Sequence, residues 1–348
     1  MPTLTLDQLR RWTIRAGLGI AAAVVLVTLV LVWLWRDRPS LDDIDWAPYP
    51  TYENSAGAVR VTWLGVSTLL FDDGDTQLLI DGFISRPTLS DLVFDKPVDS
   101  DVARINYVMD RYGMRRLAAI IPAHSHFDHA MDVGAIANRS SASVLGSATT
   151  ANIARGAGVP EDQIVVAEDG NQYSFGKFTV TMLHSQHAPF GWGGSVPYAG
   201  TVDEPLPTPA PASAWREGQS YTIHIAHPLG TALVQGSAGL SEPALAGARA
   251  DVVMLGVQLI ESLGREYAER YWQTIVTATG ARHVVLVHFD DFTQPFGEVL
   301  LLPRFIENIV DVAGWLEQFR DTWSTDTRLH LPRFGETFVL FPEAPPDA

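Results

Sequence analysis

The 348-residue chain contains no cysteine. Disulfides, thiolate-bound metals and a lipoprotein anchor are therefore excluded, and any transition metal would have to be bound by histidine and by aspartate or glutamate. Basic residues are also scarce, since 24 Lys and Arg stand against 40 Asp and Glu, for a net charge of −16. Because an acidic surface repels phosphate backbones, we expect no nucleic-acid partner.

One uncharged run interrupts this acidic chain near its N-terminus. Residues 16–35 are 20 consecutive residues without a charge, which is long enough, at about 1.5 Å per residue, to cross the hydrocarbon of a bilayer. A cleaved signal peptide would have an apolar core of about 7–15 residues that ends in small residues, whereas this run ends in Trp-Leu-Trp-Arg. We therefore favour an uncleaved transmembrane anchor over a signal peptide.

The charges that flank this run predict its orientation. Three arginines precede the run, two follow it, and acidic residues come soon after. The excess of basic residues on the N-terminal side places the N-terminus in the cytoplasm and the rest of the chain on the outer, periplasmic or extracellular, side of a single-pass membrane protein. We divide the chain into a cytoplasmic segment at 1–15, an anchor at 16–35, a linker at 36–55 and one globular domain at 56–345.

Hydrophobic patterns and turn residues in the globular part predict alternating strands and helices. Two halves, each built of strands followed by helices, indicate an α/β domain. The expected strands lie at 59–64, 67–71, 77–80, 117–121, 164–167, between Gly170 and Gly176, 177–183, 221–225, 231–235, 251–256, 283–287 and 337–341, and the expected helices at 100–112, 149–155, 265–279 and 305–323.

The densest group of potential metal ligands is the segment Pro122-Ala-His-Ser-His-Phe-Asp-His129. It follows a short apolar run and precedes a predicted helix. In an extended segment, residues two apart point the same way, so His124 and His126 can share one metal ion. Asp128 and His129, after the chain turns, can bind a second ion. A polar loop that is rich in histidine by chance rarely shows this ligand spacing.

The spacing His-x-His-x-Asp-His resembles the signature of the metallo-β-lactamase superfamily, and the resemblance extends over about residues 59–341. It implies a four-layer αββα sandwich with the ligands at one edge between two sheets, preceded here by one transmembrane helix. Within the superfamily, the chain is most similar to the ascorbate-phosphate lactonase and N-acylphosphatidylethanolamine phospholipase D branches.

Two histidines compete for the place of the third ligand in this family pattern, which stands at a strand end. His187 matches the Gln-His pattern of those branches, whereas His184 comes earlier and faces the other side if the strand continues, so we favour His187. His288 fits the closing ligand, although a strand-end histidine that caps the sheet is the alternative. The resemblance then implies a first metal held by His124, His126 and His187 and a second held by Asp128, His129 and His288.

Two further positions follow from the resemblance. Asp81 takes the place of an aspartate that supports the metal-binding loop from behind, or it is only a turn residue before Gly82. Ser237 stands where the relatives carry an aspartate that bridges both metals. A serine hydroxyl is a poor zinc ligand, so the second site is weaker, or one metal suffices, or a nearby carboxylate compensates. Asp290 and Asp291 are the candidates for compensation, although we favour simple loop charges.

The resemblance implies a metal-dependent hydrolase that uses a metal-bound hydroxide. Zinc, as one or two ions, suits the histidine-rich set best, with manganese or iron as alternatives. Asp128 would orient the hydroxide or protonate the leaving group. A small-molecule ester, lactone, amide or phosphodiester would fit, and the anchor and the aromatic residues of the loop at 188–220 together favour a lipid-like or amphiphilic ester or phosphodiester. The aromatic-containing, Pro- and Gly-rich loop at 188–220 is either a substrate cover or an inert insertion.

Two other classes stay open. One is a degenerate, membrane-tethered metal-binding module without hydrolytic activity, in which Ser237 marks the loss of catalysis. The other is a redox relative such as a di-iron enzyme, which would usually carry more acidic ligands than this set does.

Overall fold

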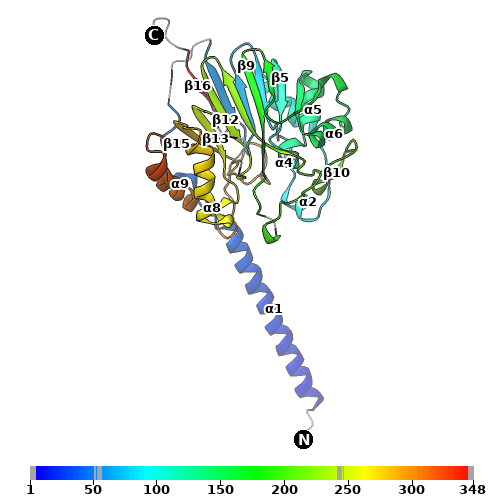
Figure 1. Cartoon of the computed structure of the whole chain (residues 1–348). Coiled ribbons are helices and arrows are strands. Elements are labelled where there is room, and N and C mark those ends of the chain that lie inside the picture. The colour runs from blue at the N-terminus through cyan, green and yellow to red at the C-terminus, as the bar shows by residue number, and fades with distance from the viewer. Residues whose placement is uncertain are drawn as a thin grey trace.

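Two seven-stranded β-sheets packed face to face make up the centre of the structure, and helices cover the outer face of each (Figure 1). This computed structural model describes residues 5–50, 52, 57–190, 192–240, 245 and 247–343. The layers follow the predicted order of helix, sheet, sheet, helix. The predicted domain limits at 56 and 345 lie outside the described residues, as do the last residues of the predicted linker, 53–55.

The first sheet joins the beginning of the domain to its end. From β16 to β3 its neighbouring strands are antiparallel, and from β3 to β7 they are parallel. Its strands in spatial order are β16 (Thr337–Phe341), β1 (Val59–Trp63), β2 (Leu69–Asp72), β3 (Gln77–Ile80), β5 (Leu117–Ile121), β6 (Ser143–Gly146) and β7 (Ile164–Val166).

The second sheet repeats this mixture. Its strands are parallel from β15 to β12 and antiparallel from β12 to β8. They are, in spatial order, β15 (Arg328–His330), β14 (His283–Val287), β13 (Val252–Gly256), β12 (Gly230–Gln235), β11 (Ser220–His227), β9 (Phe178–Ser185) and β8 (Gln172–Phe175). A separate two-stranded ribbon pairs β10 (Ala210–Pro211) with β4 (Pro97–Val98).

The helices divide between the two outer faces (Figure 1). On the side of the first sheet lie α2 (Leu89–Val93), α3 (Val102–Arg111), α4 (Phe127–Ala130), α5 (Val133–Ser140) and α6 (Ala148–Gly156). On the side of the second sheet lie α7 (Ile260–Leu263), α8 (Arg265–Trp272) and α9 (Ile309–Trp323). Short 3₁₀ turns occur at Leu41–Asp43, Glu161–Gln163, Trp192–Gly194 and Ala212–Ala214.

The strands β3 and β5, in the middle of the first sheet, are largely apolar on both faces because both faces are covered. In β3, Leu78 and Ile80 pack into the core between the sheets, whereas Leu79 packs against the helices. In β5, Ile121 joins the central core and Ile120 joins the helical layer. This alternation follows from the two-residue period of a strand, and it explains why these strands are continuous apolar runs.

A single long helix, α1 (Leu6–Arg36), extends away from the sandwich (Figure 1). Thr5 caps it and forms a capping box with Gln8. The helix has 31 residues, about 46 Å at the usual rise, and it contains the predicted run 16–35. It is long and apolar enough to cross a membrane, and its most apolar stretch is not buried by other parts of the structure.

Most of the predicted elements have somewhat different limits in the structure. The helix predicted at 265–279 is α-helical only to Trp272 and continues as a π-helical turn, Gln273–Thr277. The helix predicted to start at 305 starts at Ile309. The strand predicted at 67–71 starts at Leu69, because Gly65 and Val66 have positive φ and turn the chain.

Four strands were not predicted at all, β4, β6, β10 and β15. They have only two to four residues, which is too short for a clear alternation of apolar and polar residues.

Candidate metal centre

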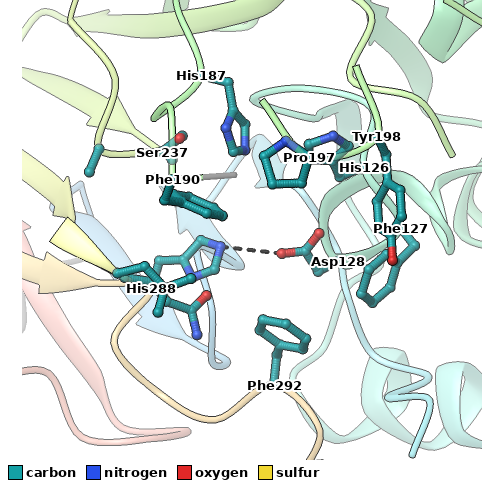
Figure 2. Close-up of a pocket in the computed structure, with 14 residues that line it drawn as sticks. His126, Phe127, Asp128, His187, Phe190, Pro197, Tyr198, Ser237, His288 and Phe292 are labelled. Atoms are coloured by element: carbon teal, nitrogen blue, oxygen red, sulfur yellow. Dashed lines mark ion pairs between the residues drawn. The ribbon is translucent and has the colours of Figure 1, made fainter. Parts of the chain in front are cut away.

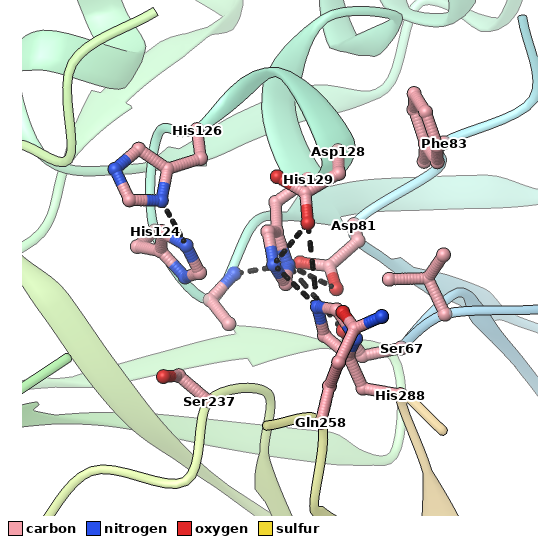
Figure 3. Close-up of polar contacts among 12 residues, drawn as sticks. Ser67, Asp81, Phe83, His124, His126, Asp128, His129, Ser237, Gln258 and His288 are labelled. Carbon is pink, nitrogen blue, oxygen red and sulfur yellow. Dashed lines mark hydrogen bonds and ion pairs between the residues drawn. The ribbon is translucent and has the colours of Figure 1, made fainter. Parts of the chain in front are cut away.

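The histidine-rich segment leaves the first sheet at the C-terminal end of β5 and crosses to α4. Asp81 directly follows the neighbouring strand β3, His288 directly follows β14, and His187 comes two residues after β9. Because these strands end at one edge of the sandwich, side chains that are far apart in the sequence meet there (Figure 3). The sequence alone could only propose this meeting.

Three buried histidines, His124, His126 and His187, form the first group of potential ligands. Nε2 of His124 lies 3.0 Å from Nδ1 of His126, and the ring centroid of His187 lies 4.7 Å and 4.8 Å from theirs. Nδ1 of His187 donates to the carbonyl of Ala188 at 2.9 Å, so its Nε2 carries the lone pair. The alternative, His184, lies outside the group with a side chain that is 46% exposed.

The second group consists of Asp128, His129 and His288, all buried. Oδ2 of Asp128 lies 3.4 Å from Nε2 of His129 and 3.3 Å from Nε2 of His288. The two Nε2 atoms are 3.3 Å apart. One ligand atom of each residue can therefore face a common point, as in the first group. Asp128 is the only carboxylate in the two groups that the described residues form.

Asp81 holds the second group from behind, and it is at the same time a turn residue. Its Oδ2 accepts a hydrogen bond from Nδ1 of His129 at 2.9 Å, and its Oδ1 accepts one from the backbone of Ala123 at 2.8 Å. It has a φ of 59°, and Gly82 has a φ of 110°. The hydroxyl of Ser67 also lies 3.3 Å from Nδ1 of His129. These contacts fix which nitrogen of His129 faces the ligand group.

The first group suits a cation because its rings are neutral. Burial lowers the pKa of His126 to about 4 and that of His187 to about 3, and it lowers the pKa of His124 well below its usual 6.5. Neutral imidazole is the form that binds metals. An all-histidine set of three fits zinc with an open position.

The second group attracts positive charge. Burial lowers the pKa of His129, but the carboxylates of Asp81 and Asp128 outweigh it and raise the pKa above the usual value. Burial raises the pKa of Asp128, but His129 and His288 outweigh it and hold the pKa well below its usual range. Since Nδ1 of His129 donates to Asp81, its Nε2 lone pair faces the Asp128 carboxylate. A cation between them satisfies both groups.

Ser237 stands near the two groups but is engaged elsewhere (Figure 3). Its hydroxyl accepts a hydrogen bond from the backbone of Ala188 at 3.0 Å, and it therefore fixes the loop that follows His187. Ser237 supplies no charge to either group. The position that the family resemblance assigns to a bridging carboxylate is thus filled here by a neutral side chain with a structural contact.

Asp290 and Asp291 do not compensate for this, and they are not simple loop charges either. Both are buried. Asp290 pairs with Arg86 at 3.4 Å and accepts from the backbone of Val66 at 2.7 Å. Asp291 pairs with Arg38 at 2.8 Å. The expectation that they are simple loop charges is therefore wrong, because each carboxylate has its own buried or half-buried arginine as a partner.

Left-handed backbone conformations cluster around the second group. Val66, Asp81, Arg86 and His288 all have φ between 51° and 59°. Such a conformation costs on the order of 1–3 kcal/mol in a non-glycine residue and persists only where the surroundings hold it. Gly65, with a φ of 88°, leaves room for the Arg86 guanidinium, which a side chain at this position would meet. The site is therefore held by its surroundings rather than by local preference.

A cavity of about 120 Å³ opens beside both groups (Figure 2). The residues that line it include four of the potential ligands, His126, Asp128, His187 and His288. Its remaining wall is mainly apolar and includes Phe127, Phe190, Pro197, Tyr198, Leu259 and Phe292. Three of these residues, Phe190, Pro197 and Tyr198, belong to the loop predicted at 188–220, which therefore lines the cavity.

The sequence did not single out several of these lining residues. Gln258 and Leu259 follow β13, and Phe292 follows β14. Their position just beyond strands of the parallel part of the second sheet is the signal that could have identified them, since such strand ends share one edge. Asp132 is buried and accepts from the backbone of Ile84 and Ser85 at 2.8 Å and 2.7 Å. It shapes the loop after β3 and does not belong to either ligand group.

Two mixed sheets between helical layers, with a His-x-His-x-Asp-His segment at their common edge, define an α/β metallo-β-lactamase-like fold. Among solved structures, the chain resembles CmlA, a diiron β-hydroxylase from Streptomyces venezuelae, at a TM-score of 0.52 and 14% identity, over 83% of this chain and 55% of that one. It also resembles the metallo-β-lactamase fold protein YhfI from Bacillus subtilis, at a TM-score of 0.45 and 15% identity, over 80% of this chain and 99% of that one. At 14% identity the likeness to CmlA concerns the fold alone.

Two curated relatives are named UPF0173 metal-dependent hydrolases. The protein from Roseiflexus sp. (strain RS-1) is 26% identical over 129 residues, which are 37% of this chain and 47% of the relative. The protein from Rhizobium etli is 26% identical over 130 residues, 37% of this chain and 48% of the relative. The match thus spans about half the length of these relatives. No family model matches the chain.

Proposed function

We propose that this protein is a membrane-anchored, metal-dependent hydrolase that acts on an uncharged ester or lactone with an apolar, lipid-like group. The observation that carries the proposal is the pair of facing ligand groups at the wall of an apolar cavity. The names of the two curated relatives agree with a metal-dependent hydrolysis. A bound divalent cation would polarise the scissile bond and lower the pKa of a water molecule.

The residues of the chain supply the rest of this chemistry. His124, His126 and His187 would hold one cation, and Asp128, His129 and His288 a second. Asp128 also lines the cavity, so its carboxylate can accept the proton of the attacking water and return it to the leaving oxygen. The apolar wall positions the substrate and excludes bulk water from the reacting bond.

The cavity wall favours an uncharged substrate over a phosphodiester. Among the described residues that line it there is neither lysine nor arginine, so only the bound cations, and no side chain of the wall, would balance a phosphate charge. A bond next to an aromatic wall formed by Phe190 and Phe292 suits an acyl or lactone group with an apolar tail. The size of the cavity admits the group around the scissile bond, and the remainder of a lipid-like molecule would lie outside it.

Zinc is the cation we propose, with manganese or iron as alternatives. Ser237 leaves the second group with one carboxylate, so we expect its cation to bind more weakly than that of the first group. We propose further that α1 crosses the membrane once, with the N-terminus in the cytoplasm and the domain on the outer side. The helix is 31 residues long and its apolar side chains are exposed, which supports this placement. An acidic domain, with a net charge of −19 after residue 38, supports the absence of a nucleic-acid partner.

Metal analysis and hydrolysis by the full-length chain in detergent test the proposal. The substrates are p-nitrophenyl esters from acetyl to dodecanoyl, a set of lactones, and bis-p-nitrophenyl phosphate as the charged comparison. We expect zinc-dependent ester or lactone turnover that a chelator abolishes. His187→Ala should lose the first cation and lower kcat/KM by roughly 10³-fold, whereas the matched variant His184→Ala, at an exposed position, should retain both. Equal loss in the two variants would contradict the assignment.

The second candidate is a membrane-tethered metal-binding module without hydrolytic activity. The observation in its favour is Ser237, because its hydroxyl is engaged by Ala188 instead of by the ligand groups. Tight cation binding without turnover on the whole substrate set would favour this candidate. Iron in the purified protein, with an oxygen-dependent reaction, would instead favour a redox enzyme.

A further inference from the structure

The segment that follows α1 is attached to the loop that carries His288. We call Asp37–Asp43 the juxtamembrane segment and residues 288–305 the His288 loop. Arg38 pairs with Asp291 at 2.8 Å and also donates to the carbonyl of Leu301. The backbone of Arg304 donates to the carbonyl of Asp37 at 2.9 Å. The two segments are therefore joined at both ends of the loop, although 253 positions separate Arg38 from Asp291.

Two neighbouring carboxylates of the His288 loop each pair with an arginine, and the pair that contains Arg38 is the more exposed of the two. The side chains of Asp290 and Asp291 are each only 2% exposed. Asp290 is balanced by the buried Arg86 and Asp291 by Arg38, whose side chain is 15% exposed. Asp291 also accepts from Thr293 and Gln294, but these are neutral groups. Arg38 is thus the charge that balances Asp291, and a buried carboxylate without such a partner destabilises the segment that contains it.

Hydrogen bonds connect these carboxylates to the backbone of Val66 and His288, beside the second ligand group. Asp290 accepts from the backbone N–H of Val66 at 2.7 Å, while the carbonyl of Val66 accepts from the N–H of His288 at 2.8 Å. His288 and Val66 both have left-handed φ, 51° in each case. A left-handed histidine keeps its ring direction only while these contacts hold the backbone. The connection runs from Arg38 through Asp291 and Asp290 to Val66 and His288.

We propose that Arg38 is a positioning residue for His288, so that the juxtamembrane segment is a working part of the metal centre and not only a tether. This inference rests on the proposed function insofar as His288 binds a cation. Its geometric content, the ordering of the His288 loop by Arg38, does not depend on that function. A fragment that begins after Arg38 would lack the pair and would have an altered second group.

The test compares Arg38→Ala with Arg36→Ala in the full-length protein in detergent. Arg36 is the matched control because it is also an arginine on the C-terminal side of the apolar run, and it is exposed at the end of α1. Co²⁺ titration, followed by visible absorbance, reports the two cation equivalents. We expect Arg38→Ala to keep the first equivalent and to bind the second about tenfold or more weakly, while Arg36→Ala binds both like the unchanged chain.

Hydrogen exchange of the metal-free protein gives an independent readout. We expect faster exchange within residues 288–301 in Arg38→Ala and unchanged exchange in Arg36→Ala. Arg38→Lys should fall between them, because it keeps the charge but cannot contact Asp291 and Leu301 with one planar group. A retained first equivalent shows that Arg38→Ala is folded. If Arg38→Ala kept the hydrogen exchange and the Co²⁺ affinities of the unchanged chain, the role of Arg38 would be overturned. If neither the variants nor the unchanged chain bound Co²⁺, the proposed function would be overturned. The exchange comparison alone would then decide whether Arg38 orders the His288 loop.

Discussion

The chemistry of the site depends, at the scale of single residues, on which nitrogen of each histidine points inward. Asp81 accepts a hydrogen bond from Nδ1 of His129, and the carbonyl of Ala188 accepts one from Nδ1 of His187. Both rings therefore present Nε2 to their ligand groups. His126 instead presents Nδ1 toward His124. The spacing of His124, His126 and His129, together with the family resemblance, predicted how the histidines group, but the choice of ring nitrogen depends on residues that are remote in sequence. Only the folded arrangement supplies the partners that make them.

Replacing Ser237 by aspartate should strengthen the second cation site. The carboxylate would add a charged oxygen ligand where a neutral hydroxyl now stands, and it can still accept the hydrogen bond from Ala188. We expect the second Co²⁺ equivalent to bind roughly tenfold more tightly, because a ligand is added to a group with one carboxylate. Isothermal titration of the full-length protein measures this.

Ser237→Ala is the control for that change. It removes the hydrogen bond to Ala188 without adding a ligand, so it should leave the second affinity unchanged or lower it. If aspartate and alanine had the same effect, position 237 would not face the cation and the expected bridging role would be wrong.

Loops at strand ends, rather than the strands themselves, shape the site at the scale of elements. The strands β3, β5, β9, β13 and β14 were predicted within a few residues, because covered strands are continuous apolar runs with turn residues at their ends. The late start of β2 and of α9 and the π-helical turn after α8 were not predicted. They depend on left-handed residues and on tertiary contacts, which leave no periodic pattern in the sequence.

The short helix α7, beside the cavity wall, is supported by a buried carboxyl group from the segment before α9, and this group predicts a pH dependence. Glu307 is only 2% exposed, and its carboxyl accepts from the backbone of Leu259, Ile260 and Glu261. Burial raises the pKa of Glu307 from 4.5 to about 7, against these hydrogen bonds. The folded chain therefore holds a proton that the unfolded chain releases between pH 4.5 and 7. The contribution of Glu307 to stability is complete below pH 4.5 and is lost as the pH rises through 7.

The free energy of unfolding, relative to Glu307→Gln, should therefore fall by roughly 3 kcal/mol between pH 4.5 and 8. Urea unfolding of both proteins across this range measures the difference. Glu266→Gln is the matched control, because Glu266 is exposed on α8 and its side chain is in water in both states. A difference for Glu307→Gln that did not change with pH would show that the carboxyl is charged in the folded protein.

At the scale of the whole molecule, α1 joins the domain at one end of the sandwich (Figure 1). Figure 1 shows that α2 and α8 lie at the end of the sandwich from which α1 leaves. Trp35 of α1 contacts Phe305, with ring centroids 6.2 Å apart, and Arg38 reaches the His288 loop. If α1 crosses a bilayer, the His288 loop lies close to the membrane surface. A lipid-like substrate would then have a short path to the cavity.

The absence of cysteine makes the membrane topology directly measurable. We expect Asp203→Cys, in an exposed part of the loop at 188–220, to react with a membrane-impermeant maleimide in intact cells. Asp7→Cys, near the start of α1, should react only after the cells are permeabilised. The unchanged chain has no thiol and gives the background. Labelling of Asp7→Cys alone in intact cells would reverse the proposed orientation, and a protein released from the membrane without residues 1–36 would indicate a cleaved signal sequence.

The sequence by itself determined that any transition metal would have to be bound by histidine and by aspartate or glutamate, because the chain has no cysteine. It also determined where the buried strands run and where an apolar helix of membrane length lies, since these features depend on local composition and period. Only the tertiary structure decided that His187 and not His184 joins the first group, that Ser237 contacts Ala188, and that Asp291 pairs with Arg38. Each of these outcomes depends on which loops meet at the edge of two packed sheets, and that meeting depends on long-range packing that local patterns do not encode.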